Sequence, residues 1–393
     1  MRLSTVLFAS CCLLAGAGVS ADNDVLDCGH RSLGDAVKNA GANRTIRFTG
    51  LCTGPIVIRR NGLTLKGVGT AVIDGAGGDA VTVAGASRAT LNNIEIRNGL
   101  SGLVASNGAH LELTGLNVHD NAVFGISLQT ASSAVLADVT TNRNGVHGLD
   151  LETGSAATVT GSLTASFNRV FGINVNGSAI TFSEATVAAN NNALGVQIAT
   201  SANAFVNDSS TVITASNNLS TGLTVVSGAH MVSFGGTINV SGNPVNGVSV
   251  NSKGGLDLDA ATTLNTFNNG DGVLLQEASV MTVFNTPQFS GQPGFSAINA
   301  HNNTGTGVRV LSGSTLTLVN QARIIGTQNS RVGLLADDGV GVTLVNSTFT
   351  GNSTKDIQLT FGTRADLQTL VFGTFTCDAT VLVRGTSGIV CPH

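Results

Sequence analysis

Charged and imidazole side chains recur at a regular interval in the first half of the chain. Arg97, Asp120 and Arg143 are separated by 23 residues each. Four further ionisable side chains lie in the same stretch: His119, His147, Asp150 and Glu152. Asp120 or Asp150 could act as a general acid, and His147 as a general base. Arg143 could hold a substrate carboxylate through paired hydrogen bonds. We therefore take Asp120, Arg143, His147 and Asp150 as candidate catalytic residues.

The same spacing has a simpler interpretation. A column of Arg97, Asp120 and Arg143 would alternate in charge along an outer face, and exposed ion pairs of this kind add little stability. Next to it, four side chains each precede a glycine: Phe124, His147, Phe171 and Leu194. They could form a shallow strip on which a ring stacks, or they could pack against a loop. Both alternatives remain open.

The remaining ionisable residues give weaker patterns. Asp257 and Asp259 share a strand face but supply fewer oxygen ligands than Ca²⁺ needs. The segment 337–339, Asp-Asp-Gly, is typical of a turn. His230 and His301 are isolated and are predicted to be surface residues. The sequence contains no hydrolase, metalloprotease or phosphate-loop motif. We therefore predict no metal and no cofactor.

Composition excludes several classes of protein. The 393 residues include 50 Gly but no Trp or Tyr, and only 11% are charged. Because 42% of the residues are hydrophobic, the chain does not resemble a disordered protein, which combines low hydrophobicity with high charge. The net charge of −4 argues against a nucleic-acid partner, which requires clustered Lys and Arg.

The N-terminus is typical of a secretory signal peptide. Arg2 precedes an apolar run, and residues 19–21, Val-Ser-Ala, match a small-residue cleavage site. We predict that residues 1–21 are removed and that the mature chain, 22–393, is exported to the periplasm or the medium. It would have no transmembrane segment and, without Arg2, a net charge of −5.

The mature chain would retain four cysteines, an even number that suggests disulfides in an exported protein. Cys28 and Cys52 lie near one end, and Cys377 and Cys391 near the other. We predict these two pairings over the other two connectivities because partners close along the chain meet most readily. A zinc site is disfavoured because no Cys-x-x-Cys spacing is present.

An internal repeat predicts the fold. An Asn followed four residues later by Gly recurs ten times at Gly-to-Gly intervals of 23 to 35 residues, and an eleventh copy has Asn352 with Asp356 in place of the Gly. The ten copies are Asn98/Gly102, Asn121/Gly125, Asn144/Gly148, Asn168/Gly172, Asn191/Gly195, Asn218/Gly222, Asn243/Gly247, Asn268/Gly272, Asn303/Gly307 and Asn329/Gly333.

Short segments with alternating apolar residues follow each Gly, which is the period of a β-strand. Strands that recur about every 23–27 residues predict an all-β solenoid of about ten to thirteen coils. The Asn would lie in a turn, where its amide can hydrogen-bond from coil to coil. Residues 285–294, inside a longer repeat that contains two Pro, are predicted to form a protruding loop.

These features resemble the right-handed parallel β-helix proteins of the pectin-lyase-like superfamily. The resemblance covers roughly residues 45–375, and the Asn column is similar to the asparagine ladders of that superfamily. It implies a single β-helix domain. Residues 22–45 would form an N-terminal cap, with a helix whose apolar positions are Leu33, Ala36, Val37 and Ala40. Residues 376–393 would form a C-terminal cap.

Two functions follow as hypotheses. The first is a non-catalytic exported protein that binds a carbohydrate or contacts a cell surface. The second is a lyase, hydrolase or epimerase acting on an acidic polysaccharide, as many members of the superfamily do. Ca²⁺ would be a cofactor only in the lyase case. The first is preferred because the sequence lacks a second carboxylate cluster and the Trp and Tyr that commonly stack on sugars. Oligomeric state is open.

Overall fold

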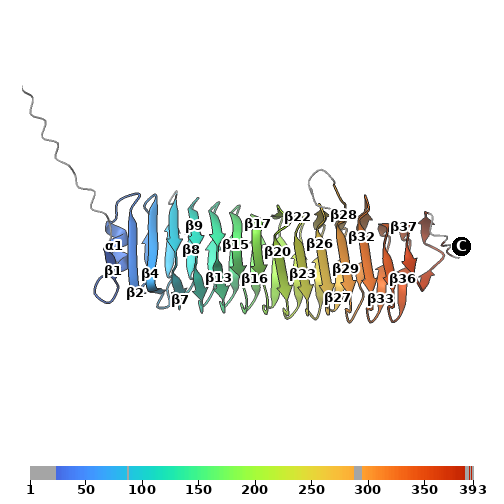
Figure 1. Cartoon of the computed structure of the whole chain (residues 1–393), viewed down its shortest axis with the longest axis horizontal. Coiled ribbons are helices and arrows are strands. Elements are labelled where there is room, and N and C mark those ends of the chain that lie inside the picture. The colour runs from blue at the N-terminus through green and yellow to red at the C-terminus, as the bar shows by residue number, and fades with distance from the viewer. Residues whose placement is uncertain (1–23, 86–87, 287–293, 386–388, 390, 392–393) are drawn as a thin grey trace, which may run out of the picture.

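The protein is an all-β rod in a computed structural model that describes residues 24–85, 88–286, 294–385, 389 and 391. Figure 1 shows strands stacked along one axis, with the chain advancing steadily from the N-terminal to the C-terminal end. Every strand pairing within the described residues is parallel; on three successive coils, for example, Ile126 pairs with Leu149 and Leu149 with Ile173. The predicted signal peptide, 1–21, lies outside the described residues.

One face of the rod is sheet B, which has 14 strands in the described part of the chain. Its strands are β3 (Ile56–Ile58), β5 (Val81–Ala84), β8 (Leu103–Ser106), β11 (Ile126–Leu128), β14 (His147–Glu152), β16 (Phe171–Asn176), β18 (Leu194–Ala199), β21 (Thr221–Val225), β24 (Asn246–Val250), β27 (Asp271–Leu275), β30 (Val308–Val310), β33 (Val332–Ala336), β36 (Lys355–Leu359) and β39 (Phe375–Cys377).

The other two faces form sheet A, which has 26 strands over the same residues. Its strands are β1 (Val25–Asp27), β2 (Thr45–Thr53), β4 (Leu63–Asp74), β6 (Ala89–Asn92), β7 (Glu95–Arg97), β9 (His110–Thr114), β10 (Asn117–His119), β12 (Ser133–Ala137), β13 (Val139–Asn142), β15 (Ala156–Thr164), β17 (Ala179–Ala188), β19 (Asn203–Val206), β20 (Val212–Ser216), β22 (His230–Phe234), β23 (Thr237–Ser241), β25 (Gly255–Asp259), β26 (Thr263–Phe267), β28 (Val280–Val283), β29 (Ala297–His301), β31 (Thr315–Leu318), β32 (Arg323–Thr327), β34 (Gly341–Val345), β35 (Thr348–Thr350), β37 (Arg364–Gln368), β38 (Val371–Phe372) and β40 (Leu382–Arg384).

The described residues form about 14 coils, one for each strand of sheet B, compared with the ten to thirteen expected from the repeat. The Asn motif marks the coils from β8 to β36, whereas β3, β5 and β39 belong to coils without it. With about 4.8 Å between neighbouring strands, the rod is roughly 60 Å long. Its interior is a continuous aliphatic core, in which Leu149, Ile173 and Val196 stack from one coil to the next and are almost completely buried.

The asparagine ladder is confirmed, with three changes of membership. Each ladder Asn accepts hydrogen bonds from the backbone N–H and the side-chain amide of the ladder Asn one coil earlier, as in Asn168 to Asn192 (2.8 and 3.2 Å). The ladder consists of Asn121, Asn144, Asn168, Asn192, Asn218, Asn243, Asn269, Asn303, Asn329 and Asn352. Asp356 ends it by accepting from Asn352 at 2.9 Å.

Asn191, Asn268 and Asn98 were therefore assigned wrongly. The first two precede a ladder Asn by one residue and adopt left-handed φ angles of 57° and 56°. The turn is one residue shorter in those coils, so the true ladder residues, Asn192 and Asn269, lie three residues before their glycines. Asn98 lies in the same left-handed position, and its amide donates to Asp74 at 2.7 Å instead of joining the ladder.

The Gly of each Asn/Gly repeat is required because neighbouring coils pack closely at this position, next to the asparagine ladder. A Cβ on Gly148 would lie 2.7 Å from both the side-chain nitrogen of Asn168 and the carbonyl oxygen of Gly172. Because real Cβ atoms do not approach so closely, the turn admits no side chain at this position.

The helix near the N-terminus and the disulfides at both ends are formed as expected. Helix α1 (Leu33–Asn39) begins at Ser32, whose hydroxyl accepts from the Asp35 N–H at 3.1 Å, and it buries Leu33 and Val37 against the first coil. The Cys28–Cys52 and Cys377–Cys391 disulfides are formed. Within the described residues, no helix is long and apolar enough to cross a membrane. The boundaries predicted for the two caps, 22–45 and 376–393, stay predictions, and part of each lies outside the described residues.

The predicted loop at 285–294 falls largely outside the described residues, which omit 287–293. At its two described ends, the Asn285 side-chain amide donates to the Gly294 carbonyl at 3.1 Å.

The ladder register predicts a sharp contrast between two neighbouring asparagines. Asn192→Ala should lower the free energy of unfolding by about 2–4 kcal/mol, because the Asn168 N–H and amide lose their buried acceptor. Asn191→Gly should change it by less than about 0.5 kcal/mol, because glycine adopts this backbone conformation without strain. Denaturant titration of both variants measures the difference. Equal effects, or a larger loss at Asn191, would show that the ladder register is wrong.

Candidate functional site

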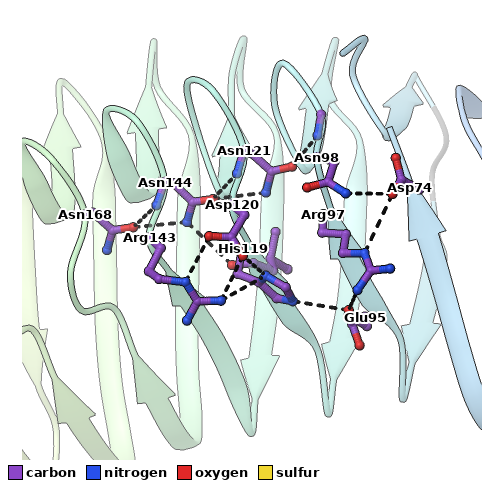
Figure 2. A network of polar contacts seen from close by, with 12 residues as sticks. Asp74, Glu95, Arg97, Asn98, His119, Asp120, Asn121, Arg143, Asn144 and Asn168 are labelled. Atoms are coloured by element: carbon purple, nitrogen blue, oxygen red, sulfur yellow. Dashed lines mark hydrogen bonds and ion pairs between the residues drawn. The ribbon is translucent and has the colours of Figure 1, made fainter. Parts of the chain in front are cut away.

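Asp120 and Arg143 form a tight ion pair on the turn side of the rod (Figure 2). The Arg143 Nε and Nη2 donate to the two Asp120 carboxylate oxygens at 2.9 and 2.8 Å, and His119 Nδ1 lies 2.6 Å from Oδ2. The hydrogen bond from Arg143 has the largest effect on Asp120, and together with that of His119 it lowers the pKa of the carboxyl group to about 2. Asp120 is therefore ionised at neutral pH.

This pair belongs to a larger polar network that runs toward the N-terminus (Figure 2). His119 Nε2 lies 3.3 Å from a Glu95 oxygen, and Arg97 Nη1 donates to the same oxygen at 2.8 Å. Arg97 also approaches Asp74, with 3.7 Å between Nε and Oδ2.

The expected column of Arg97, Asp120 and Arg143 is not formed. Arg97 pairs in register with His119, whereas Asp120 and Arg143 are one residue further on, in left-handed turn positions. The reason is that the coil before Asn121 is one residue shorter than the 23-residue spacing assumes: Gly99, whose N–H bonds to Asn121, is 22 residues away. Of the expected contacts, the one between Asp120 and Arg143 is formed, whereas Arg97 pairs with Glu95 and Asp74.

A hollow of about 580 Å³ follows this edge of the rod. Its lining includes Asp120 and Arg143, and also two residues that the sequence did not single out, Phe167 and Arg169. Phe167 is 60% exposed. The surface therefore offers an aromatic face and guanidinium groups, although Arg143 is already bound to Asp120.

His147 and Asp150 lie on a different surface, the outer face of sheet B. The Asp150 side chain has no exposed surface and accepts hydrogen bonds from Asn174 at 2.8 Å and Ser127 at 3.3 Å. Burial, assisted by the charge of Glu152, raises its pKa to about 6. His147 Nε2 lies 4.0 Å from Asp150 Oδ1.

His147 sits in an aromatic row. Its ring centroid is 5.5 Å from that of Phe124 and 4.8 Å from that of Phe171. Burial lowers its pKa to about 4, so the ring is neutral at pH 7. Since Nδ1 accepts from the Phe171 N–H at 3.3 Å, the remaining hydrogen is on Nε2, which faces Asp150. Leu194 continues the row in register with Phe171.

A polar track crosses the same face, one residue from each coil. Gln129 donates to Ser127 at 3.0 Å, and Gln197 donates to the Asn174 oxygen at 3.2 Å. With the two bonds to Asp150, these contacts connect four coils, from β11 to β18. Thr224 and Ser249 continue the track in register. Most of these side chains are buried, whereas the amides of Gln129 and Gln197 are half-buried.

The structure thus divides the four candidate residues between two clusters. Asp120 and Arg143 contact each other and His119, whereas His147 and Asp150 contact residues of sheet B. Among the described residues, no three His, Cys, Asp or Glu side chains are grouped as a metal site requires. The predicted catalytic roles are not tested by this geometry and stay predictions.

Two of the ion pairs that the sequence did not reveal lie further along the rod. His230, interpreted as isolated, has Nε2 3.0 Å from an Asp257 oxygen on the next coil, and the resulting hydrogen bond raises the pKa of the imidazole. Arg309 lies on the outer face of sheet B, 3.3 Å from Asp271. In both cases the signal was a separation of about one coil, and coil length varies from 22 to 34 residues between successive ladder positions.

Comparisons with known proteins agree on the fold. A family profile described as "Right handed beta helix region" matches residues 56–218. The A-module of mannuronan C-5 epimerase AlgE6 from Azotobacter vinelandii superposes with a TM-score of 0.51 and 14% identity, covering 89% of this chain and 93% of that one. The periplasmic alginate epimerase AlgG superposes with a TM-score of 0.43 and 9% identity, covering 93% and 84%. A search of curated protein sequences gives no match.

The chain is a right-handed parallel β-helix, as its repeat predicted. At such low identity, the likeness extends to the fold alone.

The shifted pKa values on sheet B predict two opposing pH dependences. The Asp150 pKa rises from 3.8 to about 6, so its contribution to the free energy of unfolding is complete below pH 3.8 and is lost as pH rises through 6. The His147 pKa falls from 6.5 to about 4, so its contribution is complete above pH 6.5 and is lost as pH falls through 4. Each contribution is roughly 3 kcal/mol.

Single variants should separate the two contributions. Relative to the unmodified protein, Asp150→Asn should lose stability as pH falls from 7 to 4, because the His147 contribution is no longer opposed. His147→Gln should gain relative stability over the same interval. Denaturant titrations at pH 4, 5, 6 and 7 measure both trends. Parallel pH profiles for the two variants would contradict the assigned pKa shifts.

Proposed function

We propose that this protein is an exported binding protein for an acidic polysaccharide, which it holds against the outer face of sheet B. The observation that carries the proposal is the row of half-buried rings formed by Phe124, His147 and Phe171, bordered by the half-buried amides of Gln129 and Gln197 at the ends of the polar track. Aromatic rings and rings of sugars stack readily, and fixed amides discriminate among hydroxyl groups. The two features run side by side over the same coils.

Rigidity favours this face for binding. Asp150, Asn174 and Gln197 sit on strands that pair with strands on both sides, and their side chains are bonded to a neighbour one coil away. A surface organised before the ligand arrives loses little conformational entropy when it binds. These strands carry few long charged side chains, so few flexible side chains would lose conformational entropy when a ligand binds.

An acidic ligand is favoured by fold and by local charge. The A-module that this chain resembles belongs to an enzyme named for its action on mannuronan, a polymer of uronic acid. On the turn side, next to sheet B, Arg143 and Arg169 line a common hollow. Arg143 is held by Asp120, but the exposed Arg169 can donate hydrogen bonds to the carboxylates of a chain that lies along the rod, despite the net negative charge of the whole protein.

Binding is favoured over catalysis by the state of the carboxylates. Asp120 is fully engaged by Arg143 and His119, and Asp150 has no exposed surface with which to touch a substrate. A glycoside hydrolase requires two accessible carboxylates facing the scissile bond. Sheet B presents Glu152 as a half-buried carboxylate beside Asp150, but Asp150 itself is covered.

A second candidate is a polysaccharide lyase, favoured by the pairing of His147 with Asp150. Above pH 6, Asp150 would be a carboxylate able to remove the proton from C5 of a uronate and, once protonated, to deliver it to the departing O4, which the Nε2–H of the neutral His147 would hold by a hydrogen bond. The C4–O4 bond would break as the C4–C5 double bond forms. Both groups act from one side of the sugar, which suits elimination better than epimerisation. The reaction requires Asp150 to become exposed.

Matched pairs of amide variants test binding. Gln129→Ala/Gln197→Ala removes the two half-buried ends of the track and should weaken binding of mannuronan or polygalacturonate about tenfold or more. Asn239→Ala/Asn299→Ala removes the ends of a similar amide row on sheet A and should have little effect. Isothermal titration calorimetry measures both, with a neutral β-mannan as ligand control. Absence of binding to any acidic polymer, or equal losses in the two variants, would overturn the proposal.

The lyase candidate has its own test. The unmodified protein, with and without Ca²⁺, is incubated with both uronans while the absorbance of unsaturated uronate is followed. If product forms, Asp150→Asn and His147→Gln should each reduce the rate by at least about a hundredfold, in line with loss of a general acid or base. A folded protein that forms no product excludes this candidate and leaves the binding function in place.

A further inference from the structure

A second cavity lies at the N-terminal end of sheet B, between α1 and β3. Its volume is about 780 Å³, and its lining includes three cationic side chains, Lys38, Arg59 and Arg60, but only one carboxylate, Asp35. All three cations are exposed, and no ion pair engages them within the described part of the chain. Positive charge is therefore concentrated and unneutralised here, in a chain whose net charge is −4.

The chemistry of the lining suits an anionic sugar. Arg59 and Arg60 each offer a planar group that can bind a carboxylate through two parallel hydrogen bonds. Pro55 and Val57 supply apolar surface beside these charges. A pocket that combines apolar walls with a few charged groups is the usual form of a small-ligand site.

The position of the cavity connects it to the polar track. Val57 occupies the same outward row of sheet B as Asp150, and the residues between them are Thr82, Val104 and Ser127, each paired in register with the next. Four strand spacings of about 4.8 Å separate the two places by roughly 19 Å. A polysaccharide that lies along sheet B can therefore reach from Asp150 into the cavity.

We propose that the cavity lined by Lys38, Arg59 and Arg60 is a subsite that binds the carboxylates of the acidic polysaccharide four coils from Asp150. This inference rests on the proposed function, because the ligand must first lie along sheet B. The subsite anchors one end of the bound segment by charge, while the track recognises the hydroxyls of the sugars further along. It makes affinity dependent on both the charge and the length of the ligand.

The test compares two pairs of arginine substitutions. Arg59→Gln/Arg60→Gln removes two positive charges from the cavity, and Arg364→Gln/Arg384→Gln removes two from exposed positions at the C-terminal end of sheet A. Mannuronate oligomers long enough to cross five coils are titrated into both variants by calorimetry, at low and at high salt. A neutral β-mannan oligomer of equal length is the ligand control, and melting temperatures confirm folding.

The first variant should bind the long mannuronate oligomer about tenfold more weakly, with a smaller dependence on salt because fewer charges are screened. The second should bind within about twofold of the unmodified protein, since it keeps the cavity intact. Neither should change binding of the neutral oligomer.

Three results would overturn the subsite in distinguishable ways. If Arg59→Gln/Arg60→Gln keeps full affinity while Gln129→Ala/Gln197→Ala loses it, the cavity is no subsite but sheet B still binds the polysaccharide. If the two arginine variants weaken binding equally, the attraction is general to the whole protein and not local to the cavity. If the unmodified protein binds no mannuronate oligomer, the proposed function fails together with the subsite.

Discussion

The stacked asparagine ladder is the interaction on which the rest of the structure depends. At each turn onto sheet B, a backbone N–H is buried, and leaving it without an acceptor would cost about 1–3 kcal/mol. The side-chain oxygen of the ladder Asn one coil later accepts that N–H, as Asn192 does for Asn168. Because each Asn needs the next, the turns must lie directly above one another. The same stacking leaves no space for a Cβ at Gly148 and its equivalents.

Fixed turns determine what the outer faces can present. Once the turns are aligned, residues one coil apart are neighbours, so polar rows form across strands that are distant in sequence. Such rows lie on both sheets, as the Asn239–Asn265–Asn299 amides on sheet A show. Sheet B differs in that its row includes a buried carboxylate, Asp150, alongside an aromatic row. Burying this charge raises its pKa, and the neighbouring hydrogen bonds only partly offset the cost.

Much of the fold was predictable because the signals were local and repeated. The solenoid, the capping helix that begins at Ser32, and both disulfides follow from spacing and composition. Errors arose where coil length changed. A turn shorter by one residue moved the ladder from Asn191 to Asn192, and a 22-residue coil moved Arg97 out of the column with Asp120. The alternation of apolar and polar residues does not reveal such shifts, because it stays the same in the strands before and after the turn.

The candidate site was predicted only in part, because contacts between residues on different coils depend on coil lengths that the sequence pattern does not reveal. The residues around His147 and Asp150 were identified, but the sequence combined them with Asp120 and Arg143, which lie on the other side of the turn. The basic cavity near Arg59 and Arg60 was not predicted, because Lys38 joins it from a helix that precedes the first coil. The distance from Lys38 to Arg59 and Arg60 depends on how the capping helix packs on the first coil, and the sequence pattern does not specify that packing.

The central claim is that the outer face of sheet B is the ligand-binding face. A crystal structure of the protein with a long mannuronate oligomer tests it most directly. The account predicts sugar rings over β11, β14, β16 and β18, in contact with the row of Phe124, His147 and Phe171. An oligomer bound on sheet A, or on the turn side alone without contact to sheet B, would contradict it.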